Sequence, residues 1–350
     1  MASLSASNKV ATFGEILLRL ATPKQERFVQ ANNFEIDYGG GEYNVAVSLA
    51  QFGVPTKFIT LLPKNDIGET ALNRIRSFGV DATSIKMEGK RLGLYFLENG
   101  AAMRPSKVIY DRAKSAISEV KVGQIDWEKA FKDVDWFHFT GITPALSESA
   151  AEVTMEAAKA AKKLGLTVSA DMNYRKNLWS SEEAQTIMKP LMNHVDIAIG
   201  NEEDAEKCLG VSAESQDVTS GELNPEAYKD VISKLISNFG FSKVGITLRE
   251  SISASDNNWS AVYLDNTNKE VKMHIGKKYP VHIVDRVGGG DAFSAGIIYG
   301  NIQNFTAKDT LDFAVASSAL AHTIHGDLNL VSLSEVESVA KGDTSGRVQR

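Results

Sequence analysis

Cysteine is almost absent from this chain, whose 350 residues include a single one, Cys208. One thiol excludes an internal disulfide framework and a cysteine-rich zinc site, and it suits a reducing compartment. We expect Cys208 to be a packed side chain on a helix rather than a nucleophile. No stretch approaches the roughly 20 apolar residues of a membrane span, and residues 1–9 lack the apolar core of a signal peptide. The chain is therefore expected to be cytoplasmic, with no membrane partner.

Histidine and net positive charge are also scarce. The six histidines show no H-x-x-H-type spacing, so they give no metal site. The formal net charge of −6 argues against a nucleic-acid or membrane-surface partner. With 43% hydrophobic and 23% charged residues, the composition is that of an ordinary globular protein. A chain of 350 residues suffices for one large α/β domain or two smaller ones.

Glycine is concentrated in one informative stretch, residues 284–296, where three consecutive glycines precede Asp291 and a helical pattern of small residues. Such a loop lets backbone N–H groups converge on a ligand, and the helix N-terminus adds unpaired donors and a positive dipole end. Together they form an anion site. A carboxylate there is explained if Asp291 takes the proton from a hydroxyl that attacks phosphorus. A tight loop with Asp291 as N-cap is an equally good interpretation of these residues alone.

Apolar strand-like runs alternate with helical patterns along most of the chain. Continuous apolar strands between helices predict an α/β fold, with a mostly parallel sheet covered on both faces. In such sheets the ligand lies beyond the carboxyl ends of the strands. We expect strands at residues 10–15, 57–62, 135–141, 166–171, 197–200 and 243–248, and helices at residues 41–52, 66–79, 147–164, 224–238 and 307–322.

Residues 17–37 and 91–118 do not follow this alternation, because both are strand-like without helices between them. We expect them to form one small separate sheet that covers the site, since lids exclude water where a phosphoryl group could be lost to hydrolysis. A surface hairpin without a functional part is the open alternative. The expected division is a β lid of residues 17–37 and 91–118, whose open edges favour a homo-oligomer through the lid, and an α/β core of residues 1–16, 38–90 and 119–340.

The wider string at residues 285–296, D-x-V-G-x-G-D-A-F-x-A-G, closely resembles the C-terminal signature of the PfkB (ribokinase-like) carbohydrate kinases. The resemblance runs from Gly14 to about Leu330, with the motifs in the expected order. It implies a ribokinase-like three-layer α/β/α core with the small β-sheet lid. It further implies ATP and Mg²⁺ as cofactors, Asp291 as catalytic base, and an anion hole formed by Gly288, Gly289 and Gly290.

Three further stretches resemble sugar-binding motifs of this family. Residues 39–46 resemble its N-terminal G-G-x-x-x-N-x-A signature, although without the resemblance a simple helix-start loop explains them slightly better. Residues 171–179 and 110–116 resemble the D-x-N-Y-R-x-x-L-W and Y-x-R-x-x-S-A motifs of 2-keto-3-deoxygluconate kinases. Arg112 and Arg175 in these motifs could each hold a carboxylate through two hydrogen bonds, and kinases of neutral sugars need no such pair of arginines. A surface ion pair is the open alternative for Arg175. The implied substrate contacts are Gly40, Gly41, Asn44, Tyr95, Tyr110, Arg112, Asn173, Arg175 and Asp327.

Other motifs are implied to face the nucleotide. Residues 201–204 resemble the N-x-x-E motif linked to Mg²⁺ and phosphate placement, but Asp204 replaces the glutamate, and an acidic helix start is the alternative. Residues 247–249 resemble a T-x-G turn at the phosphates, with arginine in place of the glycine. Arg286 also breaks the usual small-residue pattern beside Asp285. The implied contacts are Asn201, Thr247, Arg249, Gly288, Gly290 and Gly326 with ATP, and Asp204 indirectly with the metal.

The motifs together predict an ATP-dependent sugar-acid kinase. The expected reaction converts 2-keto-3-deoxy-D-gluconate to its 6-phosphate, with Asp291 accepting the proton of the primary hydroxyl. A fructokinase or ribokinase acting on a neutral sugar is one alternative. A non-catalytic sugar-binding regulator on the same fold is another, and the glycine loop with Asp291 argues against it.

Overall fold

The large sheet of the computed structural model, which describes residues 8–212, 225–267 and 272–347, has nine strands. Its order is β14-β13-β12-β11-β10-β9-β1-β4, with β15 paired to β13. The strands from β4 to β12 are parallel, whereas β13 to β15 extend the sheet with antiparallel pairs. Their bounds are β1 Val10–Phe13, β4 Thr56–Ile59, β9 Trp136–Thr140, β10 Thr167–Asp171, β11 Ile197–Gly200, β12 Lys243–Ser251, β13 Asp256–Asp265, β14 Lys272–Ile275 and β15 Tyr279–His282.

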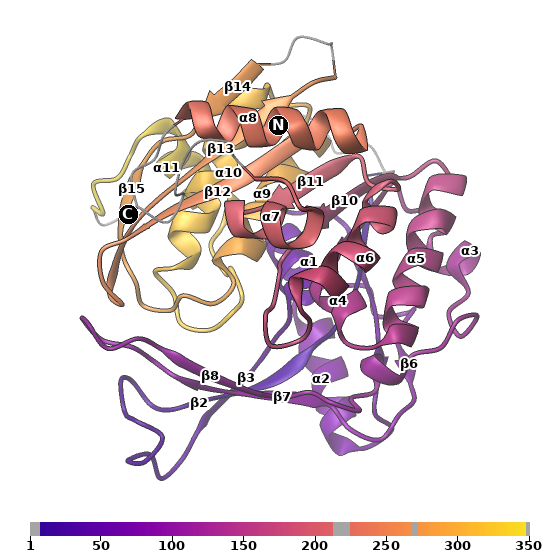
Figure 1. Ribbon diagram of the computed structural model, residues 1–350. Helices are drawn as coiled ribbons and strands as arrows, with labels where there is room; N and C mark the ends of the chain where they lie inside the picture. Colours follow the sequence, from indigo (N-terminus) through magenta and orange to yellow (C-terminus); the bar gives the residue numbers. More distant parts are fainter. Residues whose placement is uncertain (1–7, 213–224, 268–271, 348–350) are drawn as a thin grey trace.

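Helices cover both faces of this sheet, as the continuous apolar strands predicted (Figure 1). The strand side chains therefore divide between two apolar clusters. Phe137 and Val168 pack towards one set of helices, whereas Trp136 and Ile197 pack towards the other. The first set includes α3 Trp127–Ala130, α5 Glu148–Lys163, α6 Ser181–Met192, α7 Glu202–Leu209 and α8 Pro225–Phe239; the second includes α1 Gly41–Gln51, α9 Gly289–Ile302, α10 Ala307–Ala321 and α11 Leu333–Lys341.

Several of these elements differ from the sequence-based expectation. The single strand expected at residues 57–62 is divided, because after β4 the chain leaves the large sheet and β5 pairs with β6 instead. Helices α6 and α11 were not expected, although both begin with a capping box, a serine paired with a glutamate three residues later. Cys208 is buried on α7, as expected. The remaining short elements are α2 Asp66–Ser77, α4 Ile142–Ala145, β5 Leu61–Leu62, β6 Lys86–Met87 and a 3₁₀ turn at Ile117–Glu119.

The expected second, small sheet is present as a separate layer below the core in Figure 1. Its order is β3-β2-β7-β8, in which β2 and β7 run parallel and both outer pairs are antiparallel. We call it the lid sheet. No helix in the described part of the chain is long and apolar enough to cross a membrane. The lid strands are β2 Leu17–Ala21, β3 Glu35–Gly39, β7 Gly93–Glu98 and β8 Lys107–Asp111.

One buried arginine connects the lid sheet to the core. Arg19 of β2 donates from Nη1 to Asp327 Oδ1 at 2.5 Å and from Nη2 to Asp285 Oδ2. Tyr95, its neighbour on β7, donates its hydroxyl to the same oxygen of Asp327. Arg19, Asp285 and Asp327 expose at most 4% of their surface. A buried charge is tolerated only when it is paired and hydrogen-bonded, so these groups hold one another in place.

Replacing Arg19 by methionine should therefore destabilise the protein strongly. Two buried carboxylates would lose their cationic partner, which costs about 3–5 kcal/mol of unfolding free energy. Urea denaturation measures this change. Arg91→Met is the matched control, because Arg91 pairs with Asp111 on the surface, where solvent screens the pair and leaves it little effect on stability. An Arg19→Met loss no larger than that of the control would show that the buried bridge does not hold the lid sheet.

Candidate active site

A cavity of about 500 Å³ lies between the carboxyl ends of the parallel strands and the lid sheet. It is where an α/β sheet is expected to bind its ligand. The structure brings the predicted site residues together there, with one exception, Gly326, which does not line the cavity. The predicted residues that do line it are Gly40, Gly41, Asn44, Tyr95, Tyr110, Arg112, Asn173, Arg175, Asn201, Asp204, Thr247, Arg249, Gly288, Gly289, Gly290, Asp291 and Asp327.

The glycine loop leads into α9 through a left-handed residue. Gly288 is the N-cap of α9 with φ of +84°, and a Cβ placed there would lie 2.1 Å from the carbonyl oxygen of Asp327. Only glycine fits such a position without strain. Asp285 fixes the approach to it, because its Oδ1 accepts a hydrogen bond from the Val287 N–H at 3.2 Å. The loop therefore presents the first turn of α9, with its unpaired N–H groups, to the cavity.

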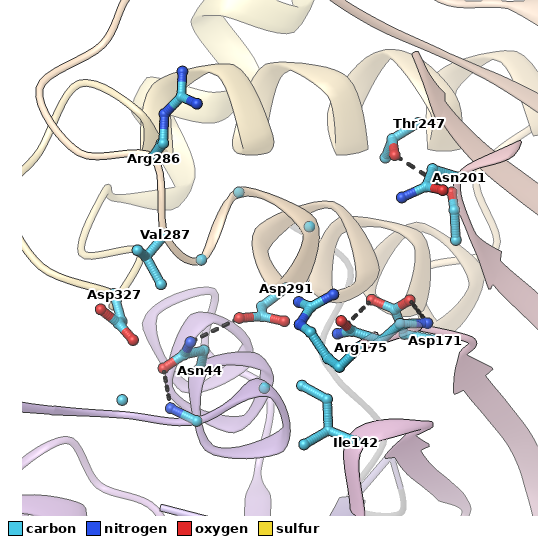
Figure 2. Close-up of a pocket in the computed structure, with 18 of the residues that line it drawn as sticks. Asn44, Ile142, Asp171, Arg175, Asn201, Thr247, Arg286, Val287, Asp291 and Asp327 are labelled. Carbon is cyan, nitrogen blue, oxygen red and sulfur yellow. Dashed lines mark hydrogen bonds between the residues drawn. The ribbon is translucent and has the colours of Figure 1, made fainter. Parts of the chain in front are cut away.

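Asp291 lies in that first turn and is the carboxylate at the centre of Figure 2. Its Oδ2 accepts a hydrogen bond from Asn44 Nδ2 at 2.7 Å, which ties α9 to α1. Burial raises the pKa of Asp291 to about 7, although the Asn44 hydrogen bond and Arg175 act in the opposite direction. A carboxylate that titrates near neutral pH is suited to accept a proton from a substrate hydroxyl.

A second acidic group lies at the end of β10. The chain turns there at Asn173, whose φ of +41° is left-handed, and Asp171 Oδ1 accepts from the Asn173 N–H. Burial and the charge of Asp204 raise the pKa of Asp171. The two oxygens of Asp204 accept hydrogen bonds from the backbone N–H groups of Tyr174 and Asn201. Residues 201–204 thus form the start of helix α7, which was the alternative to a metal-linked motif. Among the described residues no group of three or more acidic, histidine or cysteine side chains has the arrangement of a metal site.

Two arginines line the cavity where the lid sheet faces β10. The Arg112 Nε lies 3.1 Å from Glu15 Oε2, and its guanidinium lies 4.3 Å from the centre of the Tyr110 ring. Glu15 is buried and also accepts a hydrogen bond from Ser115. Burial, opposed by Arg112, raises the pKa of Glu15. Arg175 donates to the carbonyl oxygen of Tyr174 at 2.9 Å and is exposed to the cavity. Two guanidinium groups that can hold a carboxylate thus lie at this end of the cavity, beside the acidic side chains of Glu203 and Asp204.

The opposite end of the cavity is formed by β11, β12 and the glycine loop. Thr247 donates to the Gly200 carbonyl oxygen, and Asn201 caps α7. Sequence reasoning missed further lining residues here, among them Arg286 and the neighbouring rings of Trp259 and His322, whose centroids lie 4.6 Å apart at an interplanar angle of 54°. Burial lowers the pKa of His322, whose Nδ1 lies 2.7 Å from the Ser318 carbonyl oxygen.

Two predicted site residues have structural partners: Tyr95, a predicted substrate contact that lines the cavity, and Gly326, a predicted ATP contact that does not. Tyr95 is 3% exposed, and its hydroxyl donates to Asp327. Gly326 donates its N–H to Asp285 Oδ2 at 3.2 Å and so supports the loop from behind. Sequence reasoning missed Arg19 altogether, although a charged residue within the apolar run L-L-R-L-A of β2 is a signal for a buried partner.

Comparisons with known proteins agree with this geometry. A family model described as pfkB family carbohydrate kinase matches residues 7–332. The chain is 31% identical over 338 residues to a 2-dehydro-3-deoxygalactonokinase of Haloferax volcanii, covering 97% of this chain and 98% of that protein. It is 26% identical over 320 residues to a 2-dehydro-3-deoxygluconokinase of Bacillus subtilis, covering 91% and 90%. The crystal structure of a 2-dehydro-3-deoxygluconokinase from Thermotoga maritima matches with a TM-score of 0.91 and 47% identity, covering 96% of this chain and 100% of that one. These matches confirm the resemblance found in the motifs.

The titration of Asp291 predicts a pH dependence of any reaction that uses it as a base. The carboxyl is protonated below a pKa of about 7 and ionised above it, so kcat/KM should rise with pH through about 7 and then level off. Asn44→Ala removes a hydrogen bond that favours the carboxylate, so the midpoint should move upward by about one pH unit. The pH–rate profiles of both proteins measure this shift. If the rise of kcat/KM keeps the same midpoint pH in Asn44→Ala, the titrating group is not Asp291 but another group, such as one on the substrate.

Proposed function

Because the chain belongs to the pfkB family of carbohydrate kinases, we propose that it transfers the γ-phosphoryl group of ATP to 2-keto-3-deoxy-D-gluconate. One observation carries the proposal. A buried carboxylate at a helix N-terminus, Asp291, shares a single cavity with two arginines, Arg112 and Arg175. The first feature suits phosphoryl transfer, and the second suits an acceptor that carries a carboxylate.

In the proposed reaction Asp291 accepts the proton of the acceptor's primary hydroxyl. The freed oxygen forms a bond to the γ-phosphorus of ATP, while the bond between that phosphorus and the bridging oxygen breaks, and ADP leaves with the electron pair. The N–H groups of Gly288, Gly289 and Gly290 and the positive end of α9 stabilise the charge on the transferred group. The products are the 6-phosphate of the sugar acid and ADP.

The substrate is oriented by charge at one end and by hydrogen bonds along its length. Arg112 is fixed by Glu15 through Nε, which leaves the terminal nitrogens of its fork for the carboxylate. Arg175 supplies a second cation on the same side of the cavity. Asn44 and Asn173 offer amide groups to the hydroxyls, and Asp327 offers a carboxylate. With its carboxylate held by the arginines, a six-carbon chain directs its far hydroxyl towards Asp291.

The proposed cofactors are ATP and Mg²⁺. Magnesium ions in kinases are held by one or two carboxylates together with substrate phosphates and water, so they need no cage of protein ligands. Asp171 and Asp204 both line the cavity at the ends of β10 and β11, and they fit such a partial, water-mediated role. The ion would neutralise charge on the phosphates. Asn201, Thr247 and Arg249 are the proposed neighbours of the nucleotide.

The lid sheet is proposed to cover the substrate and to pair with a second copy of the chain. The proposed lid is the expected one, residues 17–37 and 91–118, with β3 continuing to Gly39. The outer strands β3 and β8 have free edges among the described residues. They expose apolar side chains, Ile36 by 67% and Ile109 by 56%. Exposed edges with apolar side chains favour association, so a homo-oligomer through this sheet is part of the proposal.

The substrate is tested by coupled ADP release with ATP and Mg²⁺ against 2-keto-3-deoxygluconate, 2-keto-3-deoxygalactonate, gluconate, fructose and ribose. We expect turnover on a keto-acid. Arg112→Met and Arg175→Met should each raise its KM by about 10- to 100-fold, because a charge-assisted contact is lost, while kcat changes less. Arg91→Met, whose pair with Asp111 does not line this cavity, should leave KM unchanged.

The other outcomes separate the alternatives. Turnover on fructose or ribose alone would contradict the substrate and leave the role of Asp291 intact. Equal effects of Arg112→Met on acid and neutral sugars would show that this arginine does not bind the carboxylate. An absence of ADP release with every sugar, in a protein that still binds ATP, would favour a sugar-binding regulator.

A further inference from the structure

Two arginines at the end of the cavity beyond the glycine loop lack a carboxylate partner in the described chain. Arg286 precedes the loop, and Arg249 lies on β12 beside Trp259 of β13. No ion pair within the described ranges includes either guanidinium, and burial together with the charge of Arg249 lowers the pKa of Arg286. Two cations that face one cavity without a counter-ion repel each other, and an anion between them relieves that repulsion.

Asp285 offsets the charge of Arg286 only in part, because it raises the pKa of Arg286 by less than burial and Arg249 lower it. Asp285 adjoins Arg286 in sequence, but its Oδ2 already accepts from Arg19 and from the Gly326 N–H. Its Oδ1 accepts from the Val287 N–H at 3.2 Å. The Asp285 side chain is fully buried behind the loop. Both oxygens of Asp285 are therefore engaged by other donors, and the Arg286 guanidinium remains able to bind a ligand anion.

The Arg286 side chain is also incompletely hydrogen-bonded. Its Nη2 donates to the Ala254 carbonyl oxygen at 3.3 Å, a long bond, whereas its Nε is buried and has no partner. A buried donor without a partner is costly unless a ligand supplies one. In Figure 2 Arg286 lies above Val287 and Asp291, whereas Asn44 lies below them. Arg286 is therefore on the side of Asp291 away from Asn44 and the sugar loop.

We propose that Arg286, together with Arg249, binds the β-phosphate of the nucleotide, the group that leaves as the terminal phosphate of ADP. The proposal rests on the nucleotide use proposed above and not on the identity of the sugar. With the γ-phosphoryl group between Asp291 and the glycine loop, the next phosphate along the nucleotide would lie towards Arg286, which precedes this loop, and Arg249, which lines the same cavity. Arginine suits this position because its planar fork binds phosphate oxygens in pairs.

The same contact has a chemical consequence. As the bond to the γ-phosphorus breaks, negative charge develops on the β-phosphate oxygen, and a cation held there stabilises both the transition state and bound ADP. The Asp285–Arg19 pair contributes indirectly, because it removes the carboxylate that would otherwise neutralise Arg286. Arg286 thus belongs to the catalytic residues, whereas Arg19 is a positioning residue.

The test compares ADP with AMP, which lacks the β-phosphate, by isothermal titration calorimetry without sugar. The unaltered protein should bind ADP more tightly than AMP. Arg286→Gln should weaken ADP binding by about 10- to 100-fold and AMP binding by no more than about twofold, because one charge-assisted phosphate contact is lost. The ADP affinity of Arg286→Lys should lie between those of the unaltered protein and Arg286→Gln, since lysine keeps the charge and loses the planar guanidinium. Arg91→Gln, outside the cavity, should change neither affinity.

Several results would overturn the proposal. They are an equal loss of ADP and AMP binding in Arg286→Gln, no loss of either, or an unaltered protein that binds both nucleotides equally. Thermal melting checks the fold, and if Arg286→Gln unfolds, Arg286→Lys and Arg249→Gln carry the same comparison. Because no sugar is present, a wrong sugar assignment leaves this binding test unaffected. A protein that releases no ADP with any sugar would contradict the proposed function, yet it could still bind ADP more tightly than AMP.

Discussion

The geometry of the cavity depends on a buried charge cluster in which Arg19 is the cation. Its two carboxylate partners are Asp285, which precedes α9 in the sequence, and Asp327, which follows α10. Asp285 accepts a hydrogen bond from Val287 beside the glycine loop, and the Asp327 backbone packs against Gly288. Arg19 itself belongs to the lid sheet. Since these charged side chains are almost fully buried, the lid strand, the loop and Asp327 are fixed relative to one another. The loop proposed to stabilise the phosphoryl group is thus held by the sheet proposed to cover the sugar.

The remaining charges form two cationic ends around an acidic centre. Arg112 and Arg175 line the proposed sugar end, and Arg249 and Arg286 the proposed nucleotide end. Between them Asp291 is buried enough that its pKa lies near 7. A carboxylate between two anions would be a poor choice for binding alone, because it repels both. It is a suitable choice for a base that must become neutral as the hydroxyl oxygen attacks, which links its burial to its proposed role.

The parts of this structure that are local in sequence could be predicted, and the parts that join distant residues could not. Strands such as Ile197–Gly200 are continuous apolar runs, and the loop before Asp291 is a contiguous motif, so both were recognised. The antiparallel extension at Asp256–Asp265 was missed, because its first half is polar and lacks the alternation of a strand. The Arg19–Asp327 contact spans 308 residues, and no sequence period indicates it.

The central claim is that Asp291 is the base of a phosphoryl transfer, and the turnover of Asp291→Asn with ATP and 2-keto-3-deoxygluconate tests it most directly. Asparagine keeps the shape of the side chain and the contact with Asn44, but it cannot accept the proton. We expect kcat to fall by about 10²- to 10⁴-fold, the usual contribution of a general base, with sugar and nucleotide affinities within about threefold of the unaltered protein. A near-normal kcat in a folded Asp291→Asn protein would contradict the assignment of the base.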